Sequence, residues 1–198
     1  MTIIVAITGG IGSGKSTFSK EVVKRGFDLL DSDKLVAEIY KNPTISFLKH
    51  LKNIGLGTSI ERKKINKKII SNIIFSNKKI KLRLERYIFK VVRQKRKKFI
   101  EIKKKQKNKI VFLDIPLLFE NKLNKKFDIV ISIISTRKNR FIRLKKSKKI
   151  TKFFFNKILK SQTSDLDRKK NSDILIFNNN SIEEYLTKIN KTLDKITK

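Results

Sequence analysis

A glycine-rich turn near the start of the chain constrains the fold more than any other feature. Residues 9–16 read GGIGSGKS and match the pattern G-x-x-x-x-G-K-[ST] in full. The run before them, Thr2–Thr8, is short and rich in β-branched residues, as in a strand buried on both faces of a parallel sheet. The residues after them, Ser16–Arg25, carry apolar side chains at helical spacing. The sequence therefore predicts a strand, a tight loop and a helix in direct succession.

This loop, residues 9–16, is named the phosphate loop because its chemistry suits a phosphate chain. Glycines let the backbone curl so that successive N–H groups and the helix N-terminus point at phosphate oxygens. We expect Lys15 to reach the β and γ phosphates of ATP, the Ser16 hydroxyl to coordinate Mg²⁺ and Thr17 to contact the α phosphate. The candidate ATP-binding residues of the loop are Gly10, Ile11, Gly12, Ser13, Gly14, Lys15, Ser16 and Thr17.

Carboxylates follow two other predicted strands. Asp114 comes after the apolar run 111–113, where an acid can lie near the Mg²⁺ of a phosphate-loop enzyme or simply end a strand. Asp31 and Asp33 follow the strand predicted at 27–30, at the edge where open α/β sheets bind their ligands. We expect that strand to lie next to the strand that feeds the phosphate loop.

The rest of the chain alternates between strand and helix patterns. Further strands are expected at 110–115, 128–134 and 173–177, and helices at 34–40, 136–162 and 181–196. Residues 44–109 look mostly helical, and so long an interval between strands indicates an inserted helical subdomain. The alternation predicts a parallel α/β sandwich.

Composition excludes several functional classes. With no Cys and one His, His50, the chain cannot build a thiol or zinc centre. A GTPase is disfavoured because the guanine-binding N-K-x-D pattern appears only as Asn121-Lys122-Leu123-Asn124, which ends in Asn. No apolar stretch approaches about 18 residues, and no basic leader precedes the first apolar run, so we expect a cytoplasmic, soluble protein without a membrane partner.

The net charge of +33 has three possible meanings. Lys makes up 40 of the 50 basic residues and Ile occurs 31 times, as expected for a genome drifting toward A/T-rich codons. Residues 1–40 hold five basic and five acidic side chains, whereas residues 62–109 hold 21 and two. Compositional drift explains the excess most simply, and no specific nucleic-acid partner is expected. Attraction of an anionic substrate and true nucleic-acid binding remain alternatives.

Several blocks together resemble the dephospho-CoA kinase family over nearly the whole chain. They are TGGIGSGKST at 8–17, DSD at 31–33, PLLFE at 116–120, Arg143 with Gln162 nineteen residues later, and DILIFNN at 173–179. The resemblance implies a P-loop three-layer α/β/α sandwich with a parallel sheet, a helical substrate-binding insertion and a helical lid. It also implies transfer of the γ-phosphoryl group of ATP to the 3′-hydroxyl of dephospho-CoA, as the last step of coenzyme A biosynthesis.

The same resemblance assigns roles within one kinase domain, residues 1–198. Residues 41–109 would be the CoA-binding subdomain and 141–168 a lid over ATP. Asp33 would be the general base, with Asp31 as the substitute candidate. Arg143 and Asn178 would contact ATP, with Asn179 near the adenine, and we expect a monomer. Another P-loop kinase for a nucleoside or small polyol, or a basic nucleic-acid-binding protein with an ATP site, remains the alternative.

The chain also departs from the family pattern. Phe89-Lys90 stands where a His-Pro pair is usual, Lys67 replaces an arginine, and Ser147-Lys148 stands where the lid has its second arginine. Lysine offers phosphate a point charge rather than a planar two-pronged donor. The lysines that could substitute in the lid are Lys145, Lys146, Lys148 and Lys149.

Three smaller expectations concern side chains near these motifs. The run Phe153-Phe154-Phe155 is expected to pack within the lid rather than to stack on a base. Glu120 is expected to orient the loop after the third strand through hydrogen bonds, with direct substrate contact as the alternative. His50 receives no role.

Overall fold

The computed structural model describes residues 1–148 and 150–197. By contacts within the chain, they form two compact units: Met1–Asp31 together with Ile100–Lys198, and Ser32–Phe99. Within the described part of the chain, no helix is both long and apolar enough to cross a membrane.

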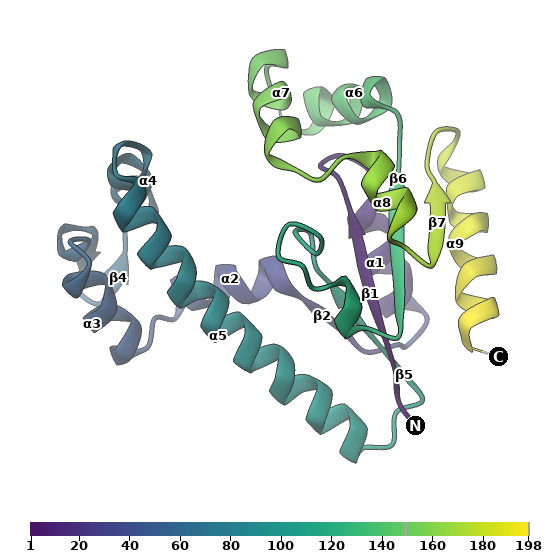
Figure 1. The fold of residues 1–198 in the computed structure, drawn as a ribbon, viewed down its shortest axis with the longest axis horizontal. Helices are drawn as coiled ribbons and strands as arrows, with labels where there is room; N and C mark the ends of the chain where they lie inside the picture. Colours follow the sequence, from purple (N-terminus) through teal and green to yellow (C-terminus); the bar gives the residue numbers. More distant parts are fainter. Residues whose placement is uncertain (149, 198) are drawn as a thin grey trace. The chain divides into compact units, whose positions relative to one another are not determined.

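The first unit contains a five-stranded parallel sheet in the order β2-β5-β1-β6-β7 (Figure 1). Its strands are β1 (Ile3–Gly9), β2 (Leu29–Asp31), β5 (Ile110–Asp114), β6 (Ile129–Ile134) and β7 (Ile174–Phe177). All neighbouring pairs run parallel, which confirms the expected α/β fold.

The order of the strands differs from the sequence expectation in one respect. Strand β5 pairs with both β1 and β2, so β2 is not next to the strand that feeds the phosphate loop. All five residues of β5 are buried, whereas the three residues of β2 are only half-buried. A continuous apolar run needs cover on both faces, so β5 occupies the interior of the sheet and β2 its edge.

Helices α1 (Lys15–Lys24) and α9 (Ile182–Thr197) cover one face of this sheet. Their apolar faces pack on side chains from alternate positions of β1, as the period of two in a strand requires. The shared core includes Val5, Ile7, Phe18, Val22, Tyr185, Ile189 and Leu193. At the surface, Arg25 Nη2 lies 2.5 Å from Asp194 Oδ1 and joins the two helices by an ion pair.

The segment 136–162, called the lid region here because it overlaps the lid expected at 141–168, is not the single helix expected from the sequence. It contains α6 (Arg137–Lys148) and α7 (Lys152–Ser161), and α7 begins where the Thr151 side chain accepts a hydrogen bond from Phe154 N–H. A third helix, α8 (Asp165–Lys170), begins with the same kind of cap at Ser164. Hydroxyl residues at these positions favour helix starts, because they satisfy N–H groups that the helix itself leaves unpaired.

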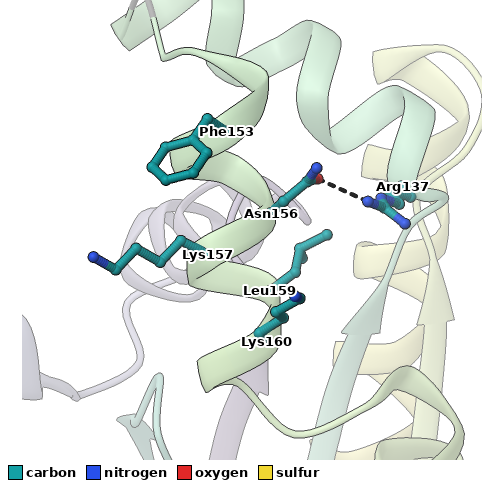
Figure 2. Close-up of a pocket in the computed structure, with 6 residues that line it drawn as sticks. All are labelled: Arg137, Phe153, Asn156, Lys157, Leu159 and Lys160. Atoms are coloured by element: carbon teal, nitrogen blue, oxygen red, sulfur yellow. Dashed lines mark hydrogen bonds between the residues drawn. The ribbon is translucent and has the colours of Figure 1, made fainter.

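The three consecutive phenylalanines of α7 divide between core and surface. Phe155 is buried and its ring packs 5.3 Å from Phe141, whereas Phe153 and Phe154 are exposed, so the packing expectation is correct for Phe155 alone. Figure 2 shows Arg137 of α6 directed at Asn156 of α7. Arg137 donates to Asn156 over 2.7 Å, and both residues line a cavity of about 530 Å³. That hydrogen bond links the two helices.

The second unit has its own apolar core. Its elements are α2 (Ser32–Lys41), α3 (Ile45–Asn53), a 3₁₀ turn η1 (Gly57–Ser59), β3 (Ile60–Glu61), β4 (Lys64–Ile65), α4 (Lys67–Ser76) and α5 (Lys78–Lys105) up to Phe99. The core includes Phe47, Leu51, Leu56, Leu84 and Ile88. His50 stacks on Tyr87 at 4.3 Å between ring centroids, so its ring packs against an aromatic partner. The unit spans 32–99, against the range 41–109 expected for the insertion.

The antiparallel pair β3–β4 was not expected among these helices. Its turn places Arg62 and Lys63 at φ of 45° and 67°, in the left-handed region that usually selects Asn or Gly. Because the sequence lacks the usual turn residues, it gives no hairpin signal at this position.

We predict that truncating the sheet core is far more costly than truncating a lid phenylalanine. Phe112 of β5 is fully buried, whereas Phe153 is 72% exposed. Phe112→Ala should therefore lower the free energy of unfolding by about 3–5 kcal/mol, and Phe153→Ala by less than about 0.5 kcal/mol. Urea denaturation followed by circular dichroism measures both. Equal losses in the two variants would contradict this description of the core.

Candidate active site

The phosphate loop adopts the curled backbone that its glycines predict. Gly12 and Gly14 have φ of 73° and 103°, in the left-handed region where a side chain is strained. Ser13 N–H donates to the Gly10 carbonyl over 3.1 Å and closes the turn. Gly14 is the N-cap of α1, so the N-terminus of that helix, where the helix itself leaves N–H groups without partners, opens onto the loop. The structure therefore confirms the expected succession of a strand, a tight loop and a helix.

Lys15 and Asp114 form an ion pair at the carboxyl edge of the sheet. Asp114 is the last residue of β5 and is only 2% exposed, and its Oδ1 accepts a hydrogen bond from Lys15 Nζ. Its Oδ2 accepts from Ser19 Oγ over 2.6 Å. Ser19 was missed by sequence reasoning, although it lies four residues after Lys15 and so on the same face of α1. The two partners offset the cost of burying the carboxylate.

The residues expected to hold Mg²⁺ are compatible with that ion. Ser16 is exposed in the first turn of α1. Asp31 and Asp114 are register partners at the ends of β2 and β5, so both side chains leave the same face of the sheet. Oxygen ligands of this kind suit Mg²⁺, which keeps several waters and takes one or two carboxylates. The described residues contain no group of three or more acidic or His side chains that could hold a metal alone.

Two side chains hold backbone carbonyls of the phosphate loop. Asn178, directly after β7, donates from Nδ2 to the Ser13 carbonyl over 2.8 Å. Tyr185 of α9 donates to the Gly14 carbonyl over 3.0 Å, and burial raises the pKa of Tyr185 well above its usual value, so it remains a donor. A Cβ at Gly14 would collide with the Asn178 amide. Position 14 therefore requires glycine for this reason as well as for its positive φ.

Arg143 of α6 is half-buried and contacts Asn178. Its Nη2 lies 3.0 Å from both the carbonyl and the Oδ1 of Asn178, and its Nη1 donates to Ser135 Oγ over 3.0 Å. Asn179 accepts from Thr136 N–H through Oδ1 over 2.8 Å. The structure therefore brings Arg143 and Asn178 together beside the loop, as members of one hydrogen-bonded group.

Ile11 of the loop is held by two lid side chains. Gln162, which follows α7, accepts a hydrogen bond from Ile11 N–H over 3.0 Å. Arg140 of α6 donates from Nε to the Ile11 carbonyl over 2.8 Å, and Arg140 was not singled out from the sequence. Only its position three residues before Arg143, on the same helical face, could have suggested it.

Glu120 connects the loop after β5 to the lid. Its Oε1 accepts from Thr163 N–H over 2.7 Å and lies 3.4 Å from Arg168 Nη2. Arg168 is 1% exposed and was also missed, because a buried arginine in a lysine-rich chain carries no sequence signal of its own. These contacts agree with the orienting role expected of Glu120.

The remaining candidates lie on helices. Asp33 is in the first turn of α2, immediately after Ser32 begins that helix, and so belongs to the second unit. Lys67 begins α4 with its Nζ 5.2 Å from the centroid of the Tyr40 ring. In the lid, Lys145 and Lys146 are exposed on α6. Lys148 ends that helix, and Lys149 lies outside the described residues.

Comparison with known proteins agrees with the geometry of the loop. A family model described as dephospho-CoA kinase matches residues 3–184. The dephospho-CoA kinase of Fusobacterium nucleatum is 31% identical over 195 residues, which covers 98% of each chain. That of Bartonella henselae is 34% identical over 185 residues, which covers 91% of each chain.

Solved structures give the same result. Dephospho-CoA kinase from Campylobacter jejuni superposes with a TM-score of 0.77 at 27% identity, covering 99% of this chain and 98% of that one. Shikimate kinase from Acinetobacter baumannii, with a TM-score of 0.53 at 14% identity, shares the fold alone. Because the family match includes the phosphate loop and extends over nearly all of the sheet and lid, this chain belongs to the dephospho-CoA kinase family of ATP-dependent kinases.

Proposed function

We propose that the protein transfers the γ-phosphoryl group of MgATP to the 3′-hydroxyl of dephospho-CoA. The observation that carries the proposal is the phosphate loop with Lys15 paired to the buried Asp114, within a chain of this family. A cation and a helix N-terminus on one loop make a site for the phosphates of ATP. The reaction needs little covalent chemistry from the protein, so positioning and charge neutralisation supply most of the rate.

ATP binding would use groups that the fold already holds in place. The N–H groups at the start of α1 and the Lys15 ammonium neutralise the β and γ phosphates. Asp114 keeps Lys15 at the loop before ATP arrives, so less side-chain freedom is lost on binding. When bound, Mg²⁺ neutralises charge on the phosphate oxygens, and Ser16 and Asp114 would hold it.

Asp33 is the proposed general base. Its carboxylate accepts the proton of the 3′-hydroxyl as that oxygen forms a bond to the γ phosphorus, while the bond between the γ phosphorus and the bridging oxygen breaks and releases ADP. Asp31, at the end of β2, is the alternative base. The helical segment 41–109 is proposed to bind the rest of dephospho-CoA.

The lid, proposed at 141–168, would close the ATP site. Arg143 and Asn178 are proposed to contact the nucleotide, and their mutual hydrogen bonds fix both before it binds. Exposed Lys145 and Lys146 are proposed to supply the positive charge of the absent second lid arginine. A lysine gives this charge without bidentate geometry, so we expect weaker stabilisation of the transition state than a guanidinium provides.

Replacing Lys15 should remove most of the catalysis. Lys15→Ala is expected to lower the rate of phosphoryl transfer by roughly two to four orders of magnitude, as for the loss of a preorganised electrostatic contact. It should also lower the melting temperature, because it removes one of the two hydrogen bonds of the buried Asp114. ADP release and differential scanning fluorimetry measure the two effects. Lys20→Ala, on an exposed position of the same helix, is the control. Near-normal turnover in Lys15→Ala would mean that the loop does not hold the reacting phosphates.

Replacing Asp33 should separate catalysis from nucleotide binding. Asp33→Asn keeps the size of the side chain but cannot accept the proton, so transfer should fall by roughly 10²–10⁴ while ATP affinity stays within about threefold. Calorimetry with ATP and chromatography of coenzyme A, on the same preparations, give the two values. Asp194→Asn, at an exposed position of α9, is the matched control. Equal losses of both would give Asp33 a Mg²⁺-binding or structural role, and loss of neither would assign the base to Asp31.

A further inference from the structure

Arg140 has an unusual position for an arginine of a lid helix. It is 3% exposed, and its Nε donates to the carbonyl of Ile11 in the phosphate loop. On the other side of the same residue, Ile11 N–H donates to Gln162. Both polar groups of one loop residue are therefore bound by side chains of the lid region, one from α6 and one from the residue after α7.

Arg140 is itself fixed by a chain of ion pairs in which both arginines are buried. Its Nη1 lies 3.1 Å from Asp165 Oδ2, and Asp165 Oδ1 accepts from Arg168 Nη1 over 3.0 Å. Arg168 then reaches Glu120, which also accepts from the backbone beyond α7. A planar guanidinium bound at two of its edges can take one orientation only. The chain thus sets the angle at which Arg140 approaches Ile11.

Stability alone does not account for this arrangement. Burial lowers the pKa of Arg140 from its ordinary value, Asp165 opposes that shift, and Arg168 adds to it. The Nη2 atom of Arg140 is buried with no hydrogen-bond partner in the part of the chain that the structure describes. A buried cation with an unused donor is costly, and an apolar side chain at this position would avoid the cost.

The composition of the chain also indicates that position 140 requires a guanidinium. Lysine outnumbers arginine 40 to 10, so arginine is scarce even where positive charge is abundant. Two of the ten arginines, Arg140 and Arg168, are buried in this one group. A lysine ammonium is a single point and cannot take the places of both Nε and Nη1, so the contacts to Ile11 and Asp165 together require a guanidinium.

We propose that Arg140 is a positioning residue for ATP, which acts through Ile11. By binding the Ile11 carbonyl at its buried side, it keeps this acceptor directed into the protein and away from the anionic phosphates. The N–H groups that follow in the loop are then free to face the ligand. The inference rests on the ATP-binding part of the proposed function and not on the identity of the acceptor.

The test compares Arg140→Lys and Arg140→Gln with Arg25→Gln, which breaks the exposed ion pair to Asp194 in the same unit. The ATP dissociation constant is measured by calorimetry without any acceptor, and the melting temperature without nucleotide. Both Arg140 variants should raise the dissociation constant about tenfold, as for loss of a charged hydrogen bond. Arg25→Gln should leave the ATP dissociation constant within about twofold of the wild-type value. The KM for dephospho-CoA should also stay within about twofold in the Arg140 variants.

Three results would overturn the proposal. One is wild-type ATP affinity in Arg140→Lys, because charge without the bridging geometry would then suffice. Another is a parallel rise in the ATP dissociation constant and in the KM for dephospho-CoA, together with a large fall in melting temperature, which marks a general structural role. If Arg140→Gln does not fold, Asp165→Asn replaces it because it weakens the ion pair that fixes Arg140, and wild-type ATP affinity in that variant would also contradict the inference. Calorimetry with ATP is independent of turnover, so failure of the proposed acceptor would be seen separately.

Discussion

The ion pair between Lys15 and the buried Asp114 is the interaction on which the site depends. A carboxylate at 2% exposure is tolerated only when its oxygens are bonded, and here Lys15 and Ser19 supply both bonds. The pair ties α1 to β5 at the carboxyl edge of the sheet. It also holds the Lys15 ammonium at the phosphate loop in the absence of ligand. The same contact therefore pairs a buried carboxylate, as folding requires, and places a positive charge where phosphate binds.

Other side chains of the first unit hold the backbone of the phosphate loop in place before ligand binds. The carbonyls of Ile11, Ser13 and Gly14 each accept a hydrogen bond from a side chain far away in sequence. With its carbonyls bound inside the protein, the loop presents its remaining N–H groups to a ligand without rearrangement. Such preorganisation is the usual source of electrostatic catalysis, because the cost of orienting the dipoles is met during folding.

Much of this was predictable from sequence, and the parts that were not have physical reasons. The phosphate loop is a local pattern, so its glycines, Lys15 and the flanking strand and helix follow from short-range rules. Partners such as Tyr185 and Arg140 come from positions more than 120 residues away, and nothing in their local sequence marks them. The interior position of β5 depends on how helices cover the sheet, which no local pattern encodes. The β3–β4 turn places Arg62 and Lys63 at positive φ, which these residue types seldom adopt.

The most direct measurement is the acceptor specificity of ATP consumption. ADP release is followed with dephospho-CoA, adenosine, AMP and gluconate at equal concentrations, and the product is identified by chromatography. We expect rapid ADP release from ATP only when dephospho-CoA is the acceptor, with one coenzyme A formed for each ADP. Faster release with adenosine, AMP or gluconate, or ATP consumption that does not depend on an acceptor, would contradict it.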